Sequence, residues 1–246
     1  MMKATGILRL ALVPVLGAFL LFGLGVASVA HAQDLRYALG VHGSMLRPAG
    51  PLKGWYNISP AFIGQLTYQV SDRTMTEVEV TYSPLSDAGL SDRQFTWHNG
   101  LGAANGTRIK SPGAEANMWI GGIVVNGLRT FKPDQTGQSV PYIAAGIGFL
   151  RYTHEVSGLI WPGQVGEQIR TDAQGMVEST VGEDVALSIN TGLGFYRRTS
   201  DQFLVDFRVR WNVSMGELRP YEDWELKKTF PIFSFNLMVG VKYFMR

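Results

Sequence analysis

The end of the chain alternates between apolar and mixed side chains at every second residue, from Phe233 to Met245. Apolar or aromatic residues occupy the odd positions, and the even positions from Ser234 to Phe244 are mixed, mostly small or polar. Because successive side chains of a strand point to opposite faces, one face of this strand is continuous hydrocarbon. A face of this kind predicts a β-barrel whose outer side contacts lipid.

The same alternation, bounded by turn residues, marks further strands along the chain. The eight candidates cover residues 35–46, 58–70, 75–84, 117–129, 141–153, 185–197, 202–214 and 232–245. Connections are short at 71–74 and 198–201 and of medium length at 132–139, but long at 47–57, 85–116, 154–184 and 215–231. Outer-membrane barrels have short turns on the periplasmic side and long loops outside. We therefore predict an all-β fold: an eight-stranded antiparallel transmembrane barrel, connected as an up-and-down meander, with both termini in the periplasm.

Charged residues lie opposite the apolar face in the clearest strands. Asp206, Arg208 and Arg210 alternate with apolar residues in 202–214. Glu77 and Glu79 alternate with valines in the same way in the strand at 75–84. A soluble core would not tolerate the charged face, nor would water favour the apolar one. The predicted polarity is charge inward and hydrocarbon outward.

Two features of the strand pattern leave alternatives open. The segment 117–129 does not alternate cleanly, so its two faces remain unassigned. Segments with some strand character lie at 94–98, 107–110, 168–171 and 176–180. We expect them to extend hairpins above the membrane, and ten membrane strands is the competing count.

The N-terminal residues are typical of an export signal. Lys3 and Arg9 precede an apolar run from Leu10 to about Val29, and Ala30-His31-Ala32 is a small-x-small cleavage site. We predict a signal peptide over residues 1–32 and a barrel domain over 33–246. A retained anchor helix is the alternative, since the run approaches the roughly 20 residues that a membrane span needs.

Composition then excludes several classes of function. Without Lys3 and Arg9, the 22 basic residues of the chain become 20, equal to its 20 acidic residues. This balance offers no basic face for nucleic acid. The absence of cysteine excludes a disulfide scaffold and thiolate-ligated metal sites. No ligand spacing supports a metal site either, and we expect no cofactor.

The inward charges are the main candidate site. The predicted lumen charge network comprises Arg36, His42, Glu77, Glu79, Asp206, Arg208, Arg210 and Lys242. An eight-stranded barrel is only just wide enough inside for side chains. Unpaired charges would be costly there, and the nearly balanced signs favour mutual pairing that plugs the lumen. A charge-lined pore for small solutes is the alternative.

Two other motifs suggest chemistry. The paired glycines at 146/148 and 192/194 lie inside alternating strands and not at a strand-to-helix turn. We therefore interpret them as space for bulky lumen side chains and not as phosphate-binding turns. His42 and Ser44 have the two-residue spacing of the lipid A deacylases, but both face the predicted lumen. A lumen histidine in a polar network is the favoured interpretation, so we predict no catalytic residues.

Three stretches carry a resemblance to a known family. Residues 141–152 are similar to a PY-x-x-x-G-x-G strand, and 190–195 with 201–210 are similar to the hairpin that follows it. Gly240, Tyr243 and Met245 fit a C-terminal Gly-x-x-hydrophobic-x-hydrophobic assembly signal, although the family more often ends in Phe. On these stretches the chain resembles the small OmpA-type, opacity-protein-like outer-membrane β-barrels.

The resemblance implies a location and a set of partners. We expect a bacterial outer-membrane protein in contact with membrane lipid and lipopolysaccharide, inserted by the barrel-assembly machinery. Its expected role is non-enzymatic, either structural in the envelope or in binding an unidentified surface ligand through the long loops. A porin-like channel and, as a weaker alternative, a lipid A-modifying hydrolase are the competing functions. Fold membership alone does not decide among them.

Overall fold

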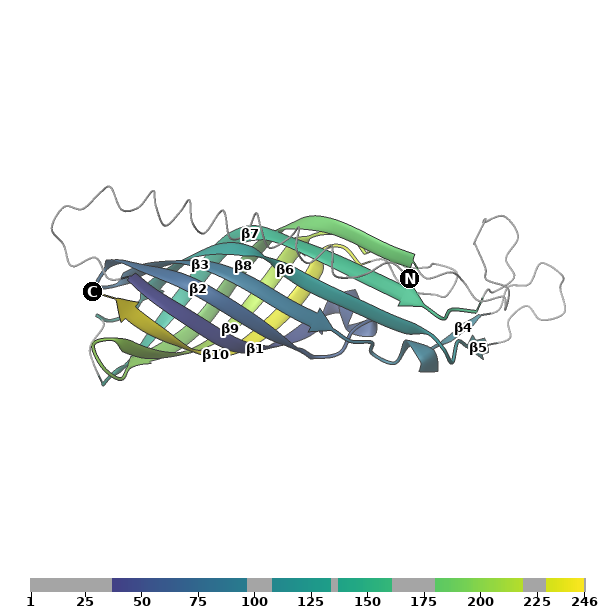
Figure 1. Cartoon of the computed structure of the whole chain (residues 1–246), viewed down its shortest axis with the longest axis horizontal. Helices are drawn as coiled ribbons and strands as arrows, with labels where there is room; N and C mark the ends of the chain where they lie inside the picture. Colours follow the sequence, from purple (N-terminus) through teal and green to yellow (C-terminus); the bar gives the residue numbers. More distant parts are fainter. Residues whose placement is uncertain (1–36, 97–107, 134–136, 161–179, 219–228, 246) are drawn as a thin grey trace. The chain divides into compact units, whose positions relative to one another are not determined.

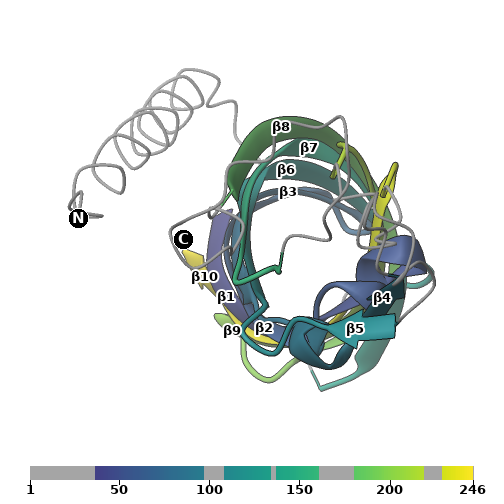
Figure 2. The same cartoon turned by 90° about the vertical axis from the view of Figure 1, so that its right-hand side faces the viewer.

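The structure, a computed structural model, describes residues 37–96, 108–133, 137–160, 180–218 and 229–245. Its eight long strands form a closed antiparallel barrel in the order β1-β10-β9-β8-β7-β6-β3-β2 (Figure 1). They are β1 (Tyr37–Ala49), β2 (Ser59–Ser71), β3 (Thr74–Leu85), β6 (Glu115–Thr130), β7 (Ser139–Ser157), β8 (Thr180–Arg198), β9 (Phe203–Met215) and β10 (Ile232–Met245). Figure 2 shows these strands as a closed ring. The predicted eight-stranded meander is confirmed.

Pairing of the first and last strands closes the barrel. β1 and β10 run antiparallel in continuous register, from Tyr37 opposite Met245 to Ala49 opposite Phe233. Each other strand pairs with its neighbours along the chain, apart from the short strands between β3 and β6. Within the described ranges, no helix is both long enough and apolar enough to cross a membrane.

The short strands form a separate sheet. β4 (Gln94–Thr96) and β5 (Arg108–Lys110) pair only with each other and lie at the end of the barrel opposite the end of β10 (Figure 1). The competing count of ten barrel strands is therefore wrong. The expected strand segment at 168–171 lies outside the described residues, as do residues 176–179. Thr180 begins β8.

Connection lengths separate the two ends of the barrel. Asp72 and Arg73 alone join β2 to β3, and residues 131–138 and 199–202 make the other connections at that end. Longer segments at 50–58, 86–114, 158–179 and 216–231 connect the strands at the opposite end. Two 3₁₀ turns, η2 (Gly50–Gly54) and η3 (Leu90–Asp92), lie within the first two of these. We call the two ends the short-connection end and the long-connection end.

The wall has the inverted polarity that the alternation predicts. Outward side chains such as Phe149, Leu193 and Leu237 are 64–65% exposed. Inward charged side chains such as Glu77 and Asp206 are fully buried. Continuous exposed apolar surface on this scale is unfavourable in water, so the wall is suited to a hydrocarbon environment.

The hairpin of β7 and β8 extends further than its sequence pattern indicated. The two strands remain paired as far as Val156 opposite Thr180, whereas prediction ended them near 153 and 185. The outward residues change from apolar to charged at Arg151 and Glu183, which form an ion pair on the outer surface. Backbone pairing thus continues beyond the apolar wall, where hydrophobic alternation no longer marks the strand.

The faces of β6 are now assigned. Trp119, Ile123 and Val125 point outward, while Met118 and Val124 point inward and are buried. Both faces are largely apolar, because the inward side of β6 contributes to two hydrophobic clusters inside the barrel. A strand that is apolar on both faces has no period-two signal.

Candidate functional site

Arg208 lies at the centre of the buried charge network. Strand β9 places it facing the lumen, and its guanidinium reaches across to β3. Arg208 Nη1 donates to Glu79 Oε1 at 2.9 Å and Nη2 donates to Glu77 Oε2 at 2.8 Å. All three side chains are fully buried. These bonds span the barrel interior from one wall to another.

Each buried acid is shared between cations. Arg210 Nη1 donates to Glu79 and Lys242 Nζ donates to Glu77, so both glutamates contact a second base as well as Arg208. Asp206 Oδ2 lies 3.2 Å from both Arg208 Nη2 and Lys242 Nζ. With carboxylates on Glu77, Glu79 and Asp206, the charges of Arg208, Arg210 and Lys242 are balanced. Burying ions is least costly when their charges balance and each ion makes several hydrogen bonds.

Tyr142 joins this network and was not expected from the sequence. Its hydroxyl donates to Asp206 Oδ1 at 2.5 Å and accepts a bond from Arg208 Nε at 2.8 Å. Gly194 makes room for it, because a Cβ there would lie 2.5 Å from Tyr142 Cζ. The paired-glycine pattern on the neighbouring strand was therefore the available signal for an inward tyrosine on β7.

The other paired glycines also lie at close approaches. A Cβ on Gly146 would lie 1.9 Å from Asn126 Oδ1, and one on Gly148 would lie 2.2 Å from the carbonyl oxygen of Ile123. A Cβ on Gly192 would lie 2.8 Å from the Val209 carbonyl oxygen. The glycines thus accommodate both side chains and the backbone of adjacent strands.

Amide and hydroxyl groups form a second polar layer, toward the long-connection end. Asn212 Nδ2 donates to Asn236 Oδ1 at 2.7 Å, and Asn236 Nδ2 donates to Ser44 Oγ at 2.9 Å. Asn190 Nδ2 donates to Asn126 Oδ1 at 2.9 Å. These uncharged residues were not among the predicted site residues, since single Asn and Ser positions give no distinctive motif.

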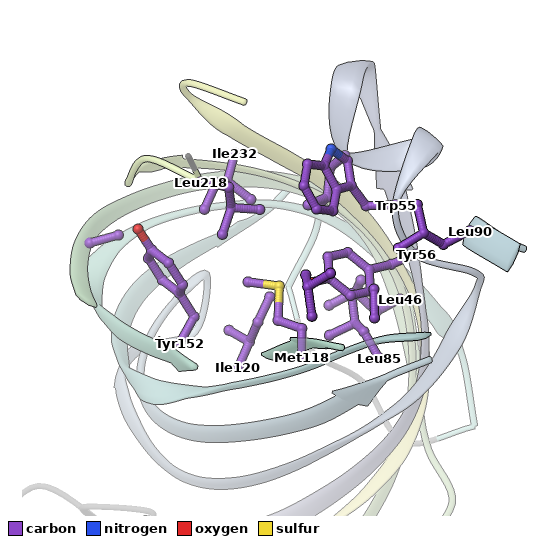
Figure 3. Close-up of a cluster of buried hydrophobic side chains, with 14 of the residues drawn as sticks. Leu46, Trp55, Tyr56, Leu85, Leu90, Met118, Ile120, Tyr152, Leu218 and Ile232 are labelled. Carbon is purple, nitrogen blue, oxygen red and sulfur yellow. The ribbon is translucent and has the colours of Figure 1, made fainter. Parts of the chain in front are cut away.

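An apolar cluster fills the mouth at the long-connection end (Figure 3). Figure 3 shows Met118, Ile120 and Tyr152 pointing from the wall into the same interior region as Trp55 and Tyr56. Each long connection contributes at least one buried apolar side chain. These are Leu52, Trp55 and Tyr56 from 50–58, Leu90 and Ala114 from 86–114, Leu159 from 158–179 and Leu218 from 216–231. We call this cluster the apolar cap.

Burial in the cap changes the acidity of two tyrosines, both beyond the apolar wall. Burial raises the pKa of Tyr56 above its ordinary value, and the nearby charge of Asp87 adds a smaller effect in the same direction. Burial, with a smaller contribution from the charge of Asp184, raises the pKa of Tyr152 to about 12. The Tyr152 hydroxyl donates to the backbone oxygen of Glu217 at 2.9 Å. The cap therefore favours the neutral forms of both phenols and ties the 216–231 connection to β7.

A smaller apolar layer lies inside the short-connection end. It includes Met75, Leu128, Leu204 and Phe244, all buried. The guanidinium of Arg198 lies 4.2 Å from the centroid of the Phe244 ring, within cation–π distance. Along its axis the described barrel thus holds an apolar layer, a charge network, an amide layer and the apolar cap.

The predicted network residues can be placed as follows. The structure buries His42, Glu77, Glu79, Asp206, Arg208, Arg210 and Lys242 together inside the barrel, whereas Arg36 lies outside the described residues. His42 Nε2 lies 3.2 Å from Asp206 Oδ2. Ser44, in contrast, bonds to Asn236, so the two residues of the deacylase-like spacing have separate partners. The described part of the chain contains no group of His, Cys, Asp or Glu residues arranged to hold a metal ion.

The three residues of the expected assembly signal lie on β10. Tyr243 and Met245 point outward, whereas Gly240 faces the lumen. A Cβ on Gly240 would lie 2.3 Å from His42 Cδ2, so glycine at this position also lets the histidine ring fit. Recognition of these residues during assembly remains a prediction.

Sequence comparison and structure comparison give different results. No family model matches the chain, and no curated protein sequence is significantly similar to it. Solved structures do match. A major outer membrane protein from Thermus thermophilus has a TM-score of 0.50 at 10% identity, covering 87% of this chain and 100% of that one.

Two other solved structures also match the chain. Neisserial surface protein A (NspA) matches with a TM-score of 0.48 at 11% identity, over 84% of this chain and 96% of that chain. The outer membrane protease OmpT of Escherichia coli matches with a TM-score of 0.41 at 10% identity, over 89% of this chain and 99% of that chain. At such low identities, likeness concerns the fold alone. At that level the expected resemblance to small outer-membrane barrels is confirmed.

Proposed function

We propose that this chain is a bacterial outer-membrane protein with a non-enzymatic role, in which a sealed barrel holds its long connections as an organised surface platform. The observation that carries the proposal is the combination of an apolar outer wall with a lumen filled by paired charges. The first feature suits lipid, and the second suits a barrel that does not conduct.

Several layers oppose passage through the lumen. A solute would have to separate Arg208 from Glu77 and Glu79, whose side chains are fully buried. It would also have to pass the apolar cap, in which Leu52 and Tyr56 are 0% and 2% exposed. Breaking a buried ion pair costs on the order of 3–5 kcal/mol, which favours a plug over the alternative of a small-solute pore.

The apolar cap supports a role for the long connections. All of them contribute side chains to one buried cluster, so they are anchored to each other and to the barrel mouth. Preorganised loops lose less conformational entropy on binding than independent ones. We propose that this surface contributes to envelope structure or binds an unidentified surface ligand. The long-connection end would face outward, next to lipopolysaccharide, and both termini would face the periplasm.

Catalysis has no comparable support. A hydrolase needs a nucleophile within reach of a base, as in a serine bonded to a histidine. His42 Nε2 is instead next to the Asp206 carboxylate and Ser44 Oγ accepts a bond from Asn236. We therefore propose that the pair is structural. Assembly would follow recognition of Gly240, Tyr243 and Met245 by the barrel-assembly machinery.

Location is tested by membrane fractionation combined with electrophoresis of boiled and unboiled samples. We expect the protein in the outer-membrane fraction, with different mobility before and after heating. Identical mobility and a soluble fraction would contradict the membrane assignment.

The closed lumen is tested in planar lipid bilayers, with protein whose heat-dependent mobility proves that it is folded. We expect insertion without regular stepwise conductance. Uniform conductance steps would establish a pore and reject the plug.

The non-enzymatic role is tested by mass spectrometry of lipid A after expression of the wild type, His42→Ala and Ser44→Ala. We expect the same lipid A masses in all three. A mass change with the wild type that either substitution abolishes would show that the chain is a hydrolase.

A further inference from the structure

Four cations gather on one side of the barrel at its short-connection end. Arg73 lies between β2 and β3, Arg129 near the end of β6, Lys132 in the 131–138 connection and Arg197 near the end of β8. In the closed barrel, β3, β6, β7 and β8 are consecutive neighbours. Arg73, Arg129 and Arg197 are exposed and Lys132 is half-buried. We call these four residues the basic rim.

The basic rim has no internal neutralisation among the described residues. None of its cations forms an ion pair there, and Arg129 Nη1 donates only to the hydroxyl of Thr74, at 3.3 Å. The acids described at this end are Asp72, which is exposed, and Asp201, whose backbone oxygen accepts a bond from Arg198. By contrast, the outward Arg151 at the long-connection end is paired with Glu183.

The basic rim borders the apolar wall directly. Arg129 is two positions beyond Gly127 and four beyond Val125 on the outward face of β6, and Arg197 follows Phe195 on the outward face of β8. Phe131, next to Lys132, is 64% exposed. Long cationic side chains at such a boundary extend their charge toward lipid headgroups while their stems remain in the apolar region.

At the same end of the barrel, the other four strands carry aromatic pairs instead of cations. Tyr37 of β1 and Tyr68 of β2 have ring centroids 5.2 Å apart, and so do Phe203 of β9 and Tyr243 of β10. Aromatic residues of this kind mark the height of a membrane interface. The basic rim occupies the corresponding end of the four remaining strands, so its cations lie where phosphate groups of lipids would be.

We propose that the basic rim binds the phosphate of an anionic glycerophospholipid in the leaflet at the short-connection end. This inference rests on the proposed membrane location. The guanidinium groups of Arg129 and Arg197, which form no ion pair with any described residue, supply charge and parallel N–H donors to phosphate, and Arg73 and Lys132 add positive charge beside them. The apolar residues above them receive the acyl chains.

The test uses the full protein in phosphatidylcholine vesicles that contain spin-labelled phosphatidylglycerol or spin-labelled phosphatidylcholine. Electron spin resonance separates lipids immobilised at the protein from free lipids. For the wild type we expect phosphatidylglycerol to be enriched roughly fivefold at a rim site, which is about 1 kcal/mol in total and matches the contribution of a single cation near the surface. The matched variants are R129Q/R197Q in the basic rim and K110Q/R151Q at the other end.

Both double variants change the net charge equally, but Lys110 and Arg151 are already paired with Asp92 and Glu183. We expect R129Q/R197Q to lose most of the phosphatidylglycerol preference and K110Q/R151Q to keep it. No preference in the wild type, or an equal loss in both variants, would overturn the proposed lipid site. Absence of any immobilised lipid would instead reject the membrane location itself.

Discussion

Arg208→Met tests whether the buried charge network stabilises the barrel. The substitution removes bonds from Arg208 to Glu77 at 2.8 Å and to Glu79 at 2.9 Å and leaves a buried excess of negative charge. Breaking a buried ion pair costs on the order of 3–5 kcal/mol. Glu77 keeps Lys242 and Glu79 keeps Arg210, so we expect a loss of about 3 kcal/mol, the lower end of that range.

The assay is urea-induced unfolding in lipid vesicles, followed by tryptophan fluorescence. With a dependence of roughly 1–3 kcal/mol per molar urea, the midpoint should fall by about 1–3 M. The control is Arg151→Met, which removes an ion pair with Glu183 whose side chains are 38% and 48% exposed. An exposed pair contributes at most about 1 kcal/mol, so this variant should unfold almost as the wild type does.

A second substitution distinguishes lost charge balance from lost packing. Adding Glu77→Gln to Arg208→Met leaves Glu79 and Asp206 opposite Arg210 and Lys242, which restores neutrality. We expect the double variant to be more stable than Arg208→Met alone, with a coupling energy of roughly 0.5–3 kcal/mol. If Arg208→Met unfolds like the Arg151 control, or if the double variant loses the sum of both single effects, the electrostatic explanation is wrong.

Three further predictions concern the apolar cap, the glycines and the phenol in the cap. Trp55→Ala should destabilise the cap by about 3–5 kcal/mol and speed trypsin cleavage of the loops, whereas Ile58→Ala, at a residue that is 53% exposed, should not. Gly194→Ala should lower the free energy of unfolding in urea by roughly 1–3 kcal/mol, because the added Cβ has no room. Its control is Gly64→Ala, where no atom lies within 4 Å of the added Cβ, and this variant should change stability by less than about 0.5 kcal/mol. The pKa of Tyr152 is about 12 in the fold against 10.0 for a free phenol, so its contribution to stability is complete below pH 10 and lost as the pH rises toward 12. Tyr152→Phe should flatten that alkaline loss in unfolding curves and remove the part of the tyrosinate absorbance that titrates near pH 12; an unchanged titration would contradict the assignment.

The strand pattern could be predicted because the barrel wall separates two environments. Wherever one face meets hydrocarbon and the other holds charge, the period of two is visible, as in β9 with Phe207 and Val209 outward and Arg208 and Arg210 inward. The pattern disappears where the interior is itself apolar. Strand β6 is the example, since inward Met118 and Val124 look the same in sequence as outward Ile123 and Val125.

The partners within the lumen were harder to predict than its charges. The sequence indicates that Glu77, Glu79 and Arg208 face inward, but their contact depends on how far the strands are shifted around the closed barrel. Tyr142 was missed because an inward tyrosine has no charge to mark it, and the bonds to Asp206 and Arg208 become visible only in the structure. The apolar cap was missed for a related reason, because the buried side chains of loops follow no period.

The charge network also discriminates among strand registers. A slip of one residue in β9 would turn Arg208 and Arg210 toward the apolar wall, and each arginine near the middle of a bilayer costs about 2–4 kcal/mol. A slip of two residues would keep the polarity but would put Asp206 or Arg210 in the place of Arg208, so the one-to-one balance of buried acids and bases opposite Glu77 and Glu79 would be lost. The apolar wall tolerates the second error, because one hydrophobic residue would replace another. Hydrocarbon burial therefore selects which face of β9 points inward, whereas the ion pairs across the lumen select which residues of β3 it faces.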